Sequence, residues 1–165
     1  MKSLIVYSSK SGNTKRLAKA VRDFLPGEKV MKAVEENPGT DGFDFICVGF
    51  WFMGGKADDH SARFLKSLDG QQPLFLFATH GAAAESDHVI SGMESAKKLV
   101  PHAIIETFSC QGEVNAEFLA KARTMNPVPV WVGDAANAAG HPDAADIKRL
   151  HRILEKAVGK IPAAA

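Results

Sequence analysis

A hydroxyl-rich turn follows the first apolar run of the chain and carries groups suited to binding an anion. The run Leu4-Ile5-Val6-Tyr7 leads into Ser9-Lys10-Ser11-Gly12-Asn13-Thr14, after which a helical pattern begins. Hydroxyl groups donate hydrogen bonds, glycine permits unusual backbone conformations, and the first N–H groups of a helix have no partners within it. A phosphate here would also lie at the positive end of the helix dipole. Residues 9–14 therefore predict a phosphate-binding site.

A second candidate site follows the third predicted strand, residues 43–49, where a turn should be polar. The sequence there is Phe50-Trp51-Phe52-Met53, followed by Gly54-Gly55. Four large apolar side chains cannot all face the core, so stacking on a planar aromatic ligand would explain the run. The alternative is an apolar hairpin cap covered by residues 126–142, a stretch without clear periodicity that is rich in proline, alanine and glycine.

A third candidate site follows the fourth predicted strand, residues 73–79. Gly81, after Thr79 and His80, would let backbone N–H groups approach the edge of a ring closely. Residues 82–84 are all alanine, and Ser86 or Asp87 caps the next helix. Ligands of an open parallel sheet bind at the carboxyl ends of its strands, so we expect these three segments to lie close together.

The spacing Ser-Lys-Ser-Gly-Asn-Thr at residues 9–14 resembles the phosphate loop of the flavodoxin family. The segments at 50–55 and 79–86 are similar in position to the two ring-binding loops of that family, and the turn at 109–113 resembles one found in some short members. The resemblance covers residues 3–110 with these motifs and implies a flavodoxin-like fold that binds FMN without a covalent bond. It also implies that the Met53-Gly54 or the Gly54-Gly55 peptide adjusts to the protonation of the flavin N5 atom.

The sequence departs from the family in the second ring-binding loop. Flavodoxins usually carry an aromatic residue there that stacks on the ring, whereas this chain has Ala82 to Ala84. One flavin face is then less covered, unless Trp131 reaches across from the long segment at 126–142.

The resemblance implies cofactor contacts for all three segments and for one residue at the end of the fifth predicted strand. The expected cofactor-binding residues are Ser9, Lys10, Ser11, Gly12, Asn13, Thr14, Phe50, Trp51, Phe52, Met53, Gly54, Gly55, Thr79, His80, Gly81, Ser86 and Cys110. It implies no catalytic residue. We expect no metal site, because His80 and His88 have no third ligand at a suitable spacing.

Apolar runs alternate with helical patterns along the chain and would position these segments. The predicted strands are residues 3–8, 28–33, 43–49, 73–79 and 103–110, and the last helix covers about 143–158. This alternation predicts a three-layer α/β fold, a doubly wound open sheet of five parallel strands in the flavodoxin-like order 2-1-3-4-5. We expect one FMN-binding domain over residues 1–165, with the fifth strand at a sheet edge.

Composition excludes several classes of protein. The chain has 165 residues, is 45% hydrophobic and carries a net charge of +1, so no basic surface points to nucleic acid. Its apolar runs are far shorter than the roughly 20 residues that span a bilayer, and no signal-peptide pattern follows Met1. We expect a cytoplasmic monomer that binds neither membrane nor nucleic acid, with Cys47 and Cys110 reduced and mostly buried.

The resemblance implies an FMN-binding electron-transfer protein that takes single electrons from a reductase and passes them to a partner redox enzyme. A narrower form of this hypothesis is a donor dedicated to one reductase, for example of a bilin or another tetrapyrrole. The alternative is an FMN-dependent reductase that binds NAD(P)H or a quinone over an exposed flavin face. A signalling receiver is disfavoured because Ser8 and Ser9 replace the acidic residues it needs, and a Walker-type loop because Phe50 replaces a required glycine.

Overall fold

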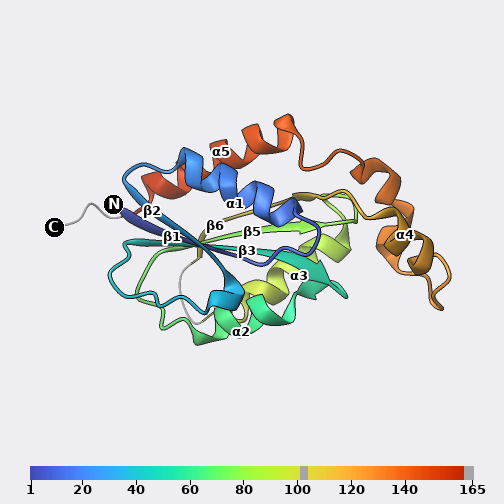
Figure 1. Cartoon of the computed structure of the whole chain (residues 1–165), viewed down its shortest axis with the longest axis horizontal. Helices are drawn as coiled ribbons and strands as arrows, with labels where there is room; N and C mark the ends of the chain where they lie inside the picture. Colours follow the sequence, from blue (N-terminus) through green and yellow to red (C-terminus); the bar gives the residue numbers. More distant parts are fainter. Residues whose placement is uncertain (101–103, 162–165) are drawn as a thin grey trace.

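A computed structural model describes residues 1–100 and 104–161 of the chain, which form a parallel sheet covered by helices on both faces (Figure 1). The strand order is β2-β1-β3-β5-β6. The bounds are β1 (Lys2–Tyr7), β2 (Glu28–Ala33), β3 (Phe45–Met53), β5 (Leu74–His80) and β6 (Ile104–Gln111). The predicted order 2-1-3-4-5 is confirmed once the two-residue strand β4 (Lys56–Ala57), which pairs only with β3, is set aside. β6 lies at a sheet edge as predicted, while Ala103 lies outside the described residues.

The central strands are mostly apolar because both of their faces are covered. In β1, Leu4 and Val6 pack into the core on one side of the sheet, and Ile5 packs into the core on the other side. All seven residues of β5 are buried. This arrangement leaves the carboxyl ends of the strands, rather than the sheet faces, as the place where a ligand can be bound.

Helices α1 (Asn13–Phe24) and α5 (Ala144–Gly159) cover one face, and α2 (Asp59–Ser67) and α3 (Asp87–Lys97) cover the other (Figure 1). α1 ends before Pro26 because the preceding residue, Leu25, is extended, as proline favours. α2 begins at its N-cap Asp58, whose side chain accepts a 3.1 Å hydrogen bond from the Ser61 N–H. Within the described ranges, no helix combines the length and apolar character needed to cross a membrane.

Short helical elements occupy the remaining connections. A 3-10 turn, η1 (Val34–Glu36), follows β2. The short helix α4 (Ala116–Ala122) follows β6, and two further 3-10 turns, η2 (Val130–Gly133) and η3 (Ala135–Ala138), precede α5. Figure 1 shows α4 beyond the carboxyl ends of the strands, outside the layers that cover the sheet.

The third predicted strand is four residues too short at its end, because β3 continues through the aromatic run to Met53. Trp51 is still paired with Thr79 of β5, and beyond it Phe52 pairs with Ala57 of β4. Backbone hydrogen bonds across this hairpin therefore hold residues that we expected in a loop. The hairpin proposed in the alternative interpretation is present, and successive side chains alternate between its two sides.

Candidate functional site

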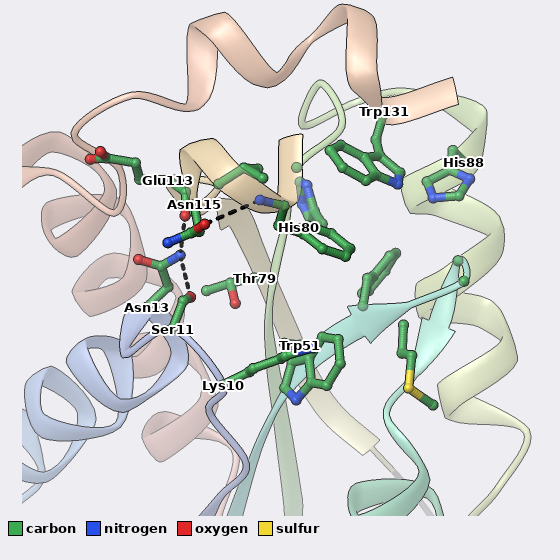
Figure 2. Close-up of a pocket in the computed structure, with 18 of the residues that line it drawn as sticks. Lys10, Ser11, Asn13, Trp51, Thr79, His80, His88, Glu113, Asn115 and Trp131 are labelled. Atoms are coloured by element: carbon green, nitrogen blue, oxygen red, sulfur yellow. Dashed lines mark hydrogen bonds between the residues drawn. The ribbon is translucent and has the colours of Figure 1, made fainter. Parts of the chain in front are cut away.

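A cavity of about 690 Å³ lies at the carboxyl ends of β1, β3 and β5 (Figure 2). All three predicted segments contribute to its wall, so the structure brings them together. The predicted residues that line it are Lys10, Ser11, Asn13, Trp51, Phe52, Met53, Gly54, Gly55, Thr79, His80 and Gly81. The volume is within the usual range for small-molecule and cofactor sites.

The turn at residues 9–14 is folded around the hydroxyl of Ser9. Its Oγ accepts hydrogen bonds of 3.1 Å from the backbone N–H groups of Gly12 and Lys15. Gly12 is the N-cap of α1 with φ 94°, a conformation that favours glycine. The Ser11 Oγ accepts a 3.0 Å hydrogen bond from Nδ2 of Asn13. Since both serine oxygens act as acceptors here, their hydroxyl hydrogens remain to be donated to a ligand.

Thr14 and Thr79 join this turn to the sheet. Their Oγ1 atoms form a 2.8 Å hydrogen bond, and both side chains are buried. One hydroxyl of the pair must donate to the other, which leaves a single hydrogen for any further partner. Thr79 lines the cavity, whereas Thr14 is buried and supports the turn through its hydrogen bond to Thr79.

Aromatic side chains form the wall around the hairpin. Trp51 and Trp131 lie on opposite sides of the cavity in Figure 2. The Phe52 ring is tilted against the imidazoles of His80 and His88, with centroid distances of 5.3 and 6.2 Å. Gly54 and Gly55 at the hairpin turn both have positive φ, 58° and 79°. The conformational role predicted for their peptides stays a prediction.

His80 is a buried neutral imidazole in the cavity wall. Its Nδ1 lies 2.9 Å from the carbonyl oxygen of Ala82, so Nδ1 carries the hydrogen and Nε2 is an acceptor. Burial lowers the pKa of His80 to about 4, although the Ala82 carbonyl favours protonation. Within the described part of the chain, Nε2 has no hydrogen-bond partner. His80 therefore contributes an uncharged polar group to the site at neutral pH.

Six predicted site residues do not line the cavity: Ser9, Gly12, Thr14, Phe50, Ser86 and Cys110. The first three belong to the turn at residues 9–14. The side chains of Phe50 and Cys110 have no exposed surface and belong to the cores on opposite faces of the sheet, so they cannot reach a ligand. Ser86 is the N-cap of α3, but its side chain makes no capping hydrogen bond. The alternation of side chains along a strand decides where Phe50 and Cys110 lie, and the position of α3 decides where Ser86 lies. Closeness in sequence to the cavity-lining residues did not predict these placements.

Residues after β6 form the part of the wall that sequence reasoning largely missed. His88 of α3 also lines the cavity, and the additional lining residues after β6 are Gly112, Glu113, Val114, Asn115, Glu117, Phe118, Lys121 and Trp131. The sequence predicts Trp131 as a residue that could cover one flavin face. It also indicates the turn at 109–113, through its resemblance to a turn of some short flavodoxins. Phe118 is an apolar residue of α4 that lines the cavity and is 45% exposed. No local signal distinguishes an apolar residue that lines a cavity from one that enters the core.

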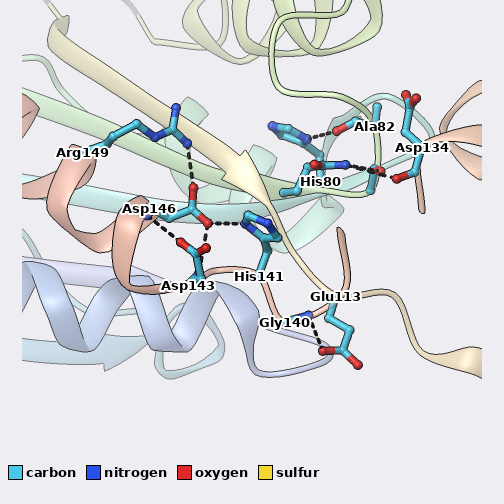
Figure 3. A network of polar contacts seen from close by, with 11 residues as sticks. His80, Ala82, Glu113, Asp134, Gly140, His141, Asp143, Asp146 and Arg149 are labelled. Carbon is cyan, nitrogen blue, oxygen red and sulfur yellow. Dashed lines mark hydrogen bonds and ion pairs between the residues drawn. The ribbon is translucent and has the colours of Figure 1, made fainter. Parts of the chain in front are cut away.

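Hydrogen bonds fasten this additional segment to the predicted site (Figure 3). Nδ2 of Asn13 donates to the Glu113 carbonyl at 2.9 Å, and the Glu113 carboxylate accepts from the Gly140 N–H at 2.9 Å. The Asp134 carboxylate accepts a 2.8 Å hydrogen bond from the Ala83 N–H. The segments at 113–121 and 126–142 are thus tied to the turn after β1 and to the loop after β5.

The start of α5 carries a cluster of His141, Asp143 and Asp146 whose ligand atoms lie close enough to hold a metal ion (Figure 3). Arg149 donates to one Asp146 oxygen at 2.7 Å, His141 contacts the other, and Asp143 and Asp146 form a capping box. Burial alone would raise the pKa of Asp146, but the hydrogen bonds from Asp143, His141 and Arg149 hold it below its ordinary value. These contacts explain the cluster as the start of a helix.

Comparison with known proteins agrees with this geometry. The chain matches the family model of a flavodoxin domain over residues 4–155. It is similar to the flavodoxin-like domain-containing protein BilS of Clostridioides difficile (strain CD3), with 33% identity over 131 residues that cover 76% of this chain and 74% of that protein. BilS of Clostridium symbiosum (strain WAL-14163) is 28% identical over an alignment of 190 positions that covers 99% and 98% of the two chains.

The fold is similar to that of oxidised flavodoxin 2 from Bacillus cereus. The TM-score is 0.62 at 16% identity, and the superposition covers 97% of this chain and 99% of that one. A sequence identity of 16% to flavodoxin 2 shows a similar fold only. The match to the family model and the similarity to the BilS proteins show that the sequences are related. The chain belongs to the flavodoxin domain family.

Proposed function

We propose that the protein binds FMN and carries single electrons from a reductase to a partner redox enzyme. The observation that carries this proposal is a cavity that joins a hydroxyl-rich helix start to a set of aromatic side chains. FMN combines the same two kinds of group, a phosphate and a planar isoalloxazine ring. When bound, FMN supplies the redox chemistry, and the protein supplies binding, orientation and electrostatics.

The turn at residues 9–14 fits the phosphate. The hydroxyls of Ser9 and Ser11 have hydrogens to donate, because their oxygens already accept from other groups. The N–H groups of the first turn of α1 lack partners inside the helix, and of these the Lys15 N–H already donates to the Ser9 Oγ. The dipole of this 12-residue helix adds attraction for a negative charge at its start.

The other side of the cavity fits a flat ring. Trp51 offers an aromatic face, and the backbone at Gly81 lies close to the wall. A Cβ at Gly81 would lie 3.1 Å from Val114 and 3.2 Å from Trp131, so a side chain there would crowd this part of the wall. The neutral His80 imidazole adds polarity without a positive charge. These residues would orient the ring and keep water from part of it.

Reconstitution tests the proposal directly. The purified protein is mixed with excess FMN, desalted and titrated anaerobically with dithionite while its absorbance spectrum is recorded. We expect flavin to be retained and to be reduced in two resolved one-electron steps. Loss of the flavin on desalting would contradict FMN binding, and reduction in one two-electron step would contradict a single-electron carrier.

An FMN-dependent reductase is the second candidate function. Asn115, Glu117 and Lys121 line the cavity and would offer hydrogen bonds and charge to a second bound molecule. Rapid oxidation of NAD(P)H by the FMN-loaded protein with a quinone as acceptor would favour this candidate. Slow oxidation, together with rapid electron delivery to a protein acceptor, favours the carrier.

A further inference from the structure

We propose that Phe118, supported by Trp131, forms the second stacking face for the isoalloxazine ring, opposite Trp51. This inference rests on the proposed binding of FMN and identifies a positioning residue outside the segments that sequence reasoning assigned to the ring. Phe118 belongs to α4, which follows the edge strand β6 and lies beyond the carboxyl ends of the sheet (Figure 1). The ring would then be held between residues about 70 positions apart in the chain.

The Phe118 ring is held in place by a second aromatic ring. Its centroid lies 5.7 Å from that of Trp131, and the two planes differ by only 8°. Trp131 is in turn supported from behind, because its indole packs against the backbone at Gly81 and against the core cluster on the α2 and α3 side of the sheet. Phe118 nevertheless remains 45% exposed and lines the cavity, so one of its faces is available to a ligand.

Lys10 sets an upper limit on the distance between the two aromatic walls. Its Nζ lies over the Trp51 ring at 5.5 Å and over the Phe118 ring at 5.5 Å. The two centroids are therefore separated by no more than twice that distance. Stacked aromatic rings have centroids about 4.5–7 Å apart. A planar ring at the position of the ammonium group would thus be within stacking distance of both Trp51 and Phe118.

The loop after β5 offers no competing aromatic group on this side. Residues 82–84 are alanines, and the small Gly81 leaves room for Trp131 to pack against the loop backbone. The covering function is therefore supplied by α4 and η2 instead of by this loop. Lys10 would have to leave the space between Trp51 and Phe118 when the ring enters, and its flexible side chain permits this movement.

The test measures binding of FMN and of riboflavin to Phe118→Ala, with fluorescence lifetimes of the bound flavins as a second readout. Loss of a stacking face should weaken both flavins equally, by about tenfold, and lengthen the lifetime because quenching by the aromatic stack is lost. Phe118→Tyr should restore both values. Met125→Ala is the matched control, since Met125 is also exposed in this segment but does not line the cavity.

Phe118→Ala should fold normally because Phe118 is 45% exposed and lies outside the two core clusters, and circular dichroism checks this. Unchanged affinity and unchanged lifetime in Phe118→Ala, relative to the wild type and Met125→Ala, would overturn the inference while leaving the proposed function intact. A wild-type protein that binds neither flavin would overturn both. Weakening of FMN alone, with riboflavin unaffected, would also overturn the stacking role, since it would place the effect at the phosphate.

Discussion

The hydroxyl of Ser11 shows how one residue can be set up for a ligand by its neighbour. Because Nδ2 of Asn13 donates to the Ser11 Oγ, the serine hydrogen is directed away from Asn13 and remains available. The second hydrogen of the Asn13 amide is used by the Glu113 carbonyl. The side chain of Asn13 thus organises the turn, and Ser11 is left as the donor.

Ser11→Ala should therefore weaken FMN about tenfold and leave riboflavin unchanged, because a hydrogen bond to a charged phosphate is lost. Isothermal titration with the two flavins measures the difference. Ser67→Ala, which removes a hydroxyl bonded to the Phe64 carbonyl on α2, serves as control. Equal weakening of both flavins would show that Ser11 does not act on the phosphate.

Protonation of His80 makes the stability of the fold depend on pH. Its pKa is lowered from 6.5 to about 4 by burial, so protons bind more readily to the unfolded chain between these pH values. The stability contributed by the neutral imidazole is complete above pH 6.5 and is lost as the pH falls toward 4.

Replacing His80 with Asn should reduce the acid sensitivity of the protein. Between pH 7 and pH 5, we expect the free energy of unfolding of the wild type to fall by about 2 kcal/mol more than that of His80→Asn. Urea titrations of both proteins at the two pH values measure this difference. Parallel losses in the two proteins would mean that His80 is not kept neutral by the fold.

The segment between β6 and α5 is held to the site by polar contacts as well as by buried residues such as Ala135 and Ala138. Val128 and Val130 are exposed, whereas the Asp134 carboxylate accepts a hydrogen bond from the Ala83 N–H. Gln111 strengthens the same junction, because its Nε2 donates to the carbonyl groups of Gly81 and Asp134. The position of η2, and with it Trp131, depends on this junction.

Asp134→Ala should loosen the junction without unfolding the sheet. A hydrogen bond to a charged group is worth about 1.5–3 kcal/mol, so exchange of the Ala83 amide should become at least about tenfold faster. Hydrogen exchange monitored by NMR measures this, with Asp41→Ala in the loop before β3 as control. If the Ala83 amide exchanges equally in all three proteins, Asp134 does not hold the loop.

The whole molecule protects both of its cysteine thiols. Cys47 and Cys110 are free and have no exposed surface, and they belong to the core on the α1 and α5 side of the sheet. Burial raises the pKa of each thiol, which disfavours the reactive thiolate. Only opening of the sheet and helix layers together exposes both groups.

Thiol labelling should therefore report global unfolding. In buffer, we expect an aromatic disulfide reagent to leave the native protein unmodified over minutes, and in urea to modify two thiols per chain along the same curve as the loss of circular dichroism. Fast modification of either thiol in the native protein would contradict this picture of the core.

Much of this protein could be read from local sequence patterns. Residues 28–33 were predicted as a strand with the bounds that β2 has, and the turn at 9–14 was identified from residue types within six positions. The α/β layering followed from alternating apolar periodicities, since a helix or strand with one apolar face can be recognised from its own residues. The sequence alone determined the element order, the fold class and the candidate phosphate-binding turn.

Tertiary structure decided which aromatic side chains enter the core and which line the cavity. Phe50 is fully buried and Trp51 lines the cavity, although both belong to one apolar run, because the pairing of β3 with β4 and β5 sets the direction of each side chain. The wall formed by Phe118 and Trp131 depends on packing between α4, η2 and the loop after β5. Such contacts join residues far apart in the chain, and their free energy depends on surfaces that exist only once the layers have assembled.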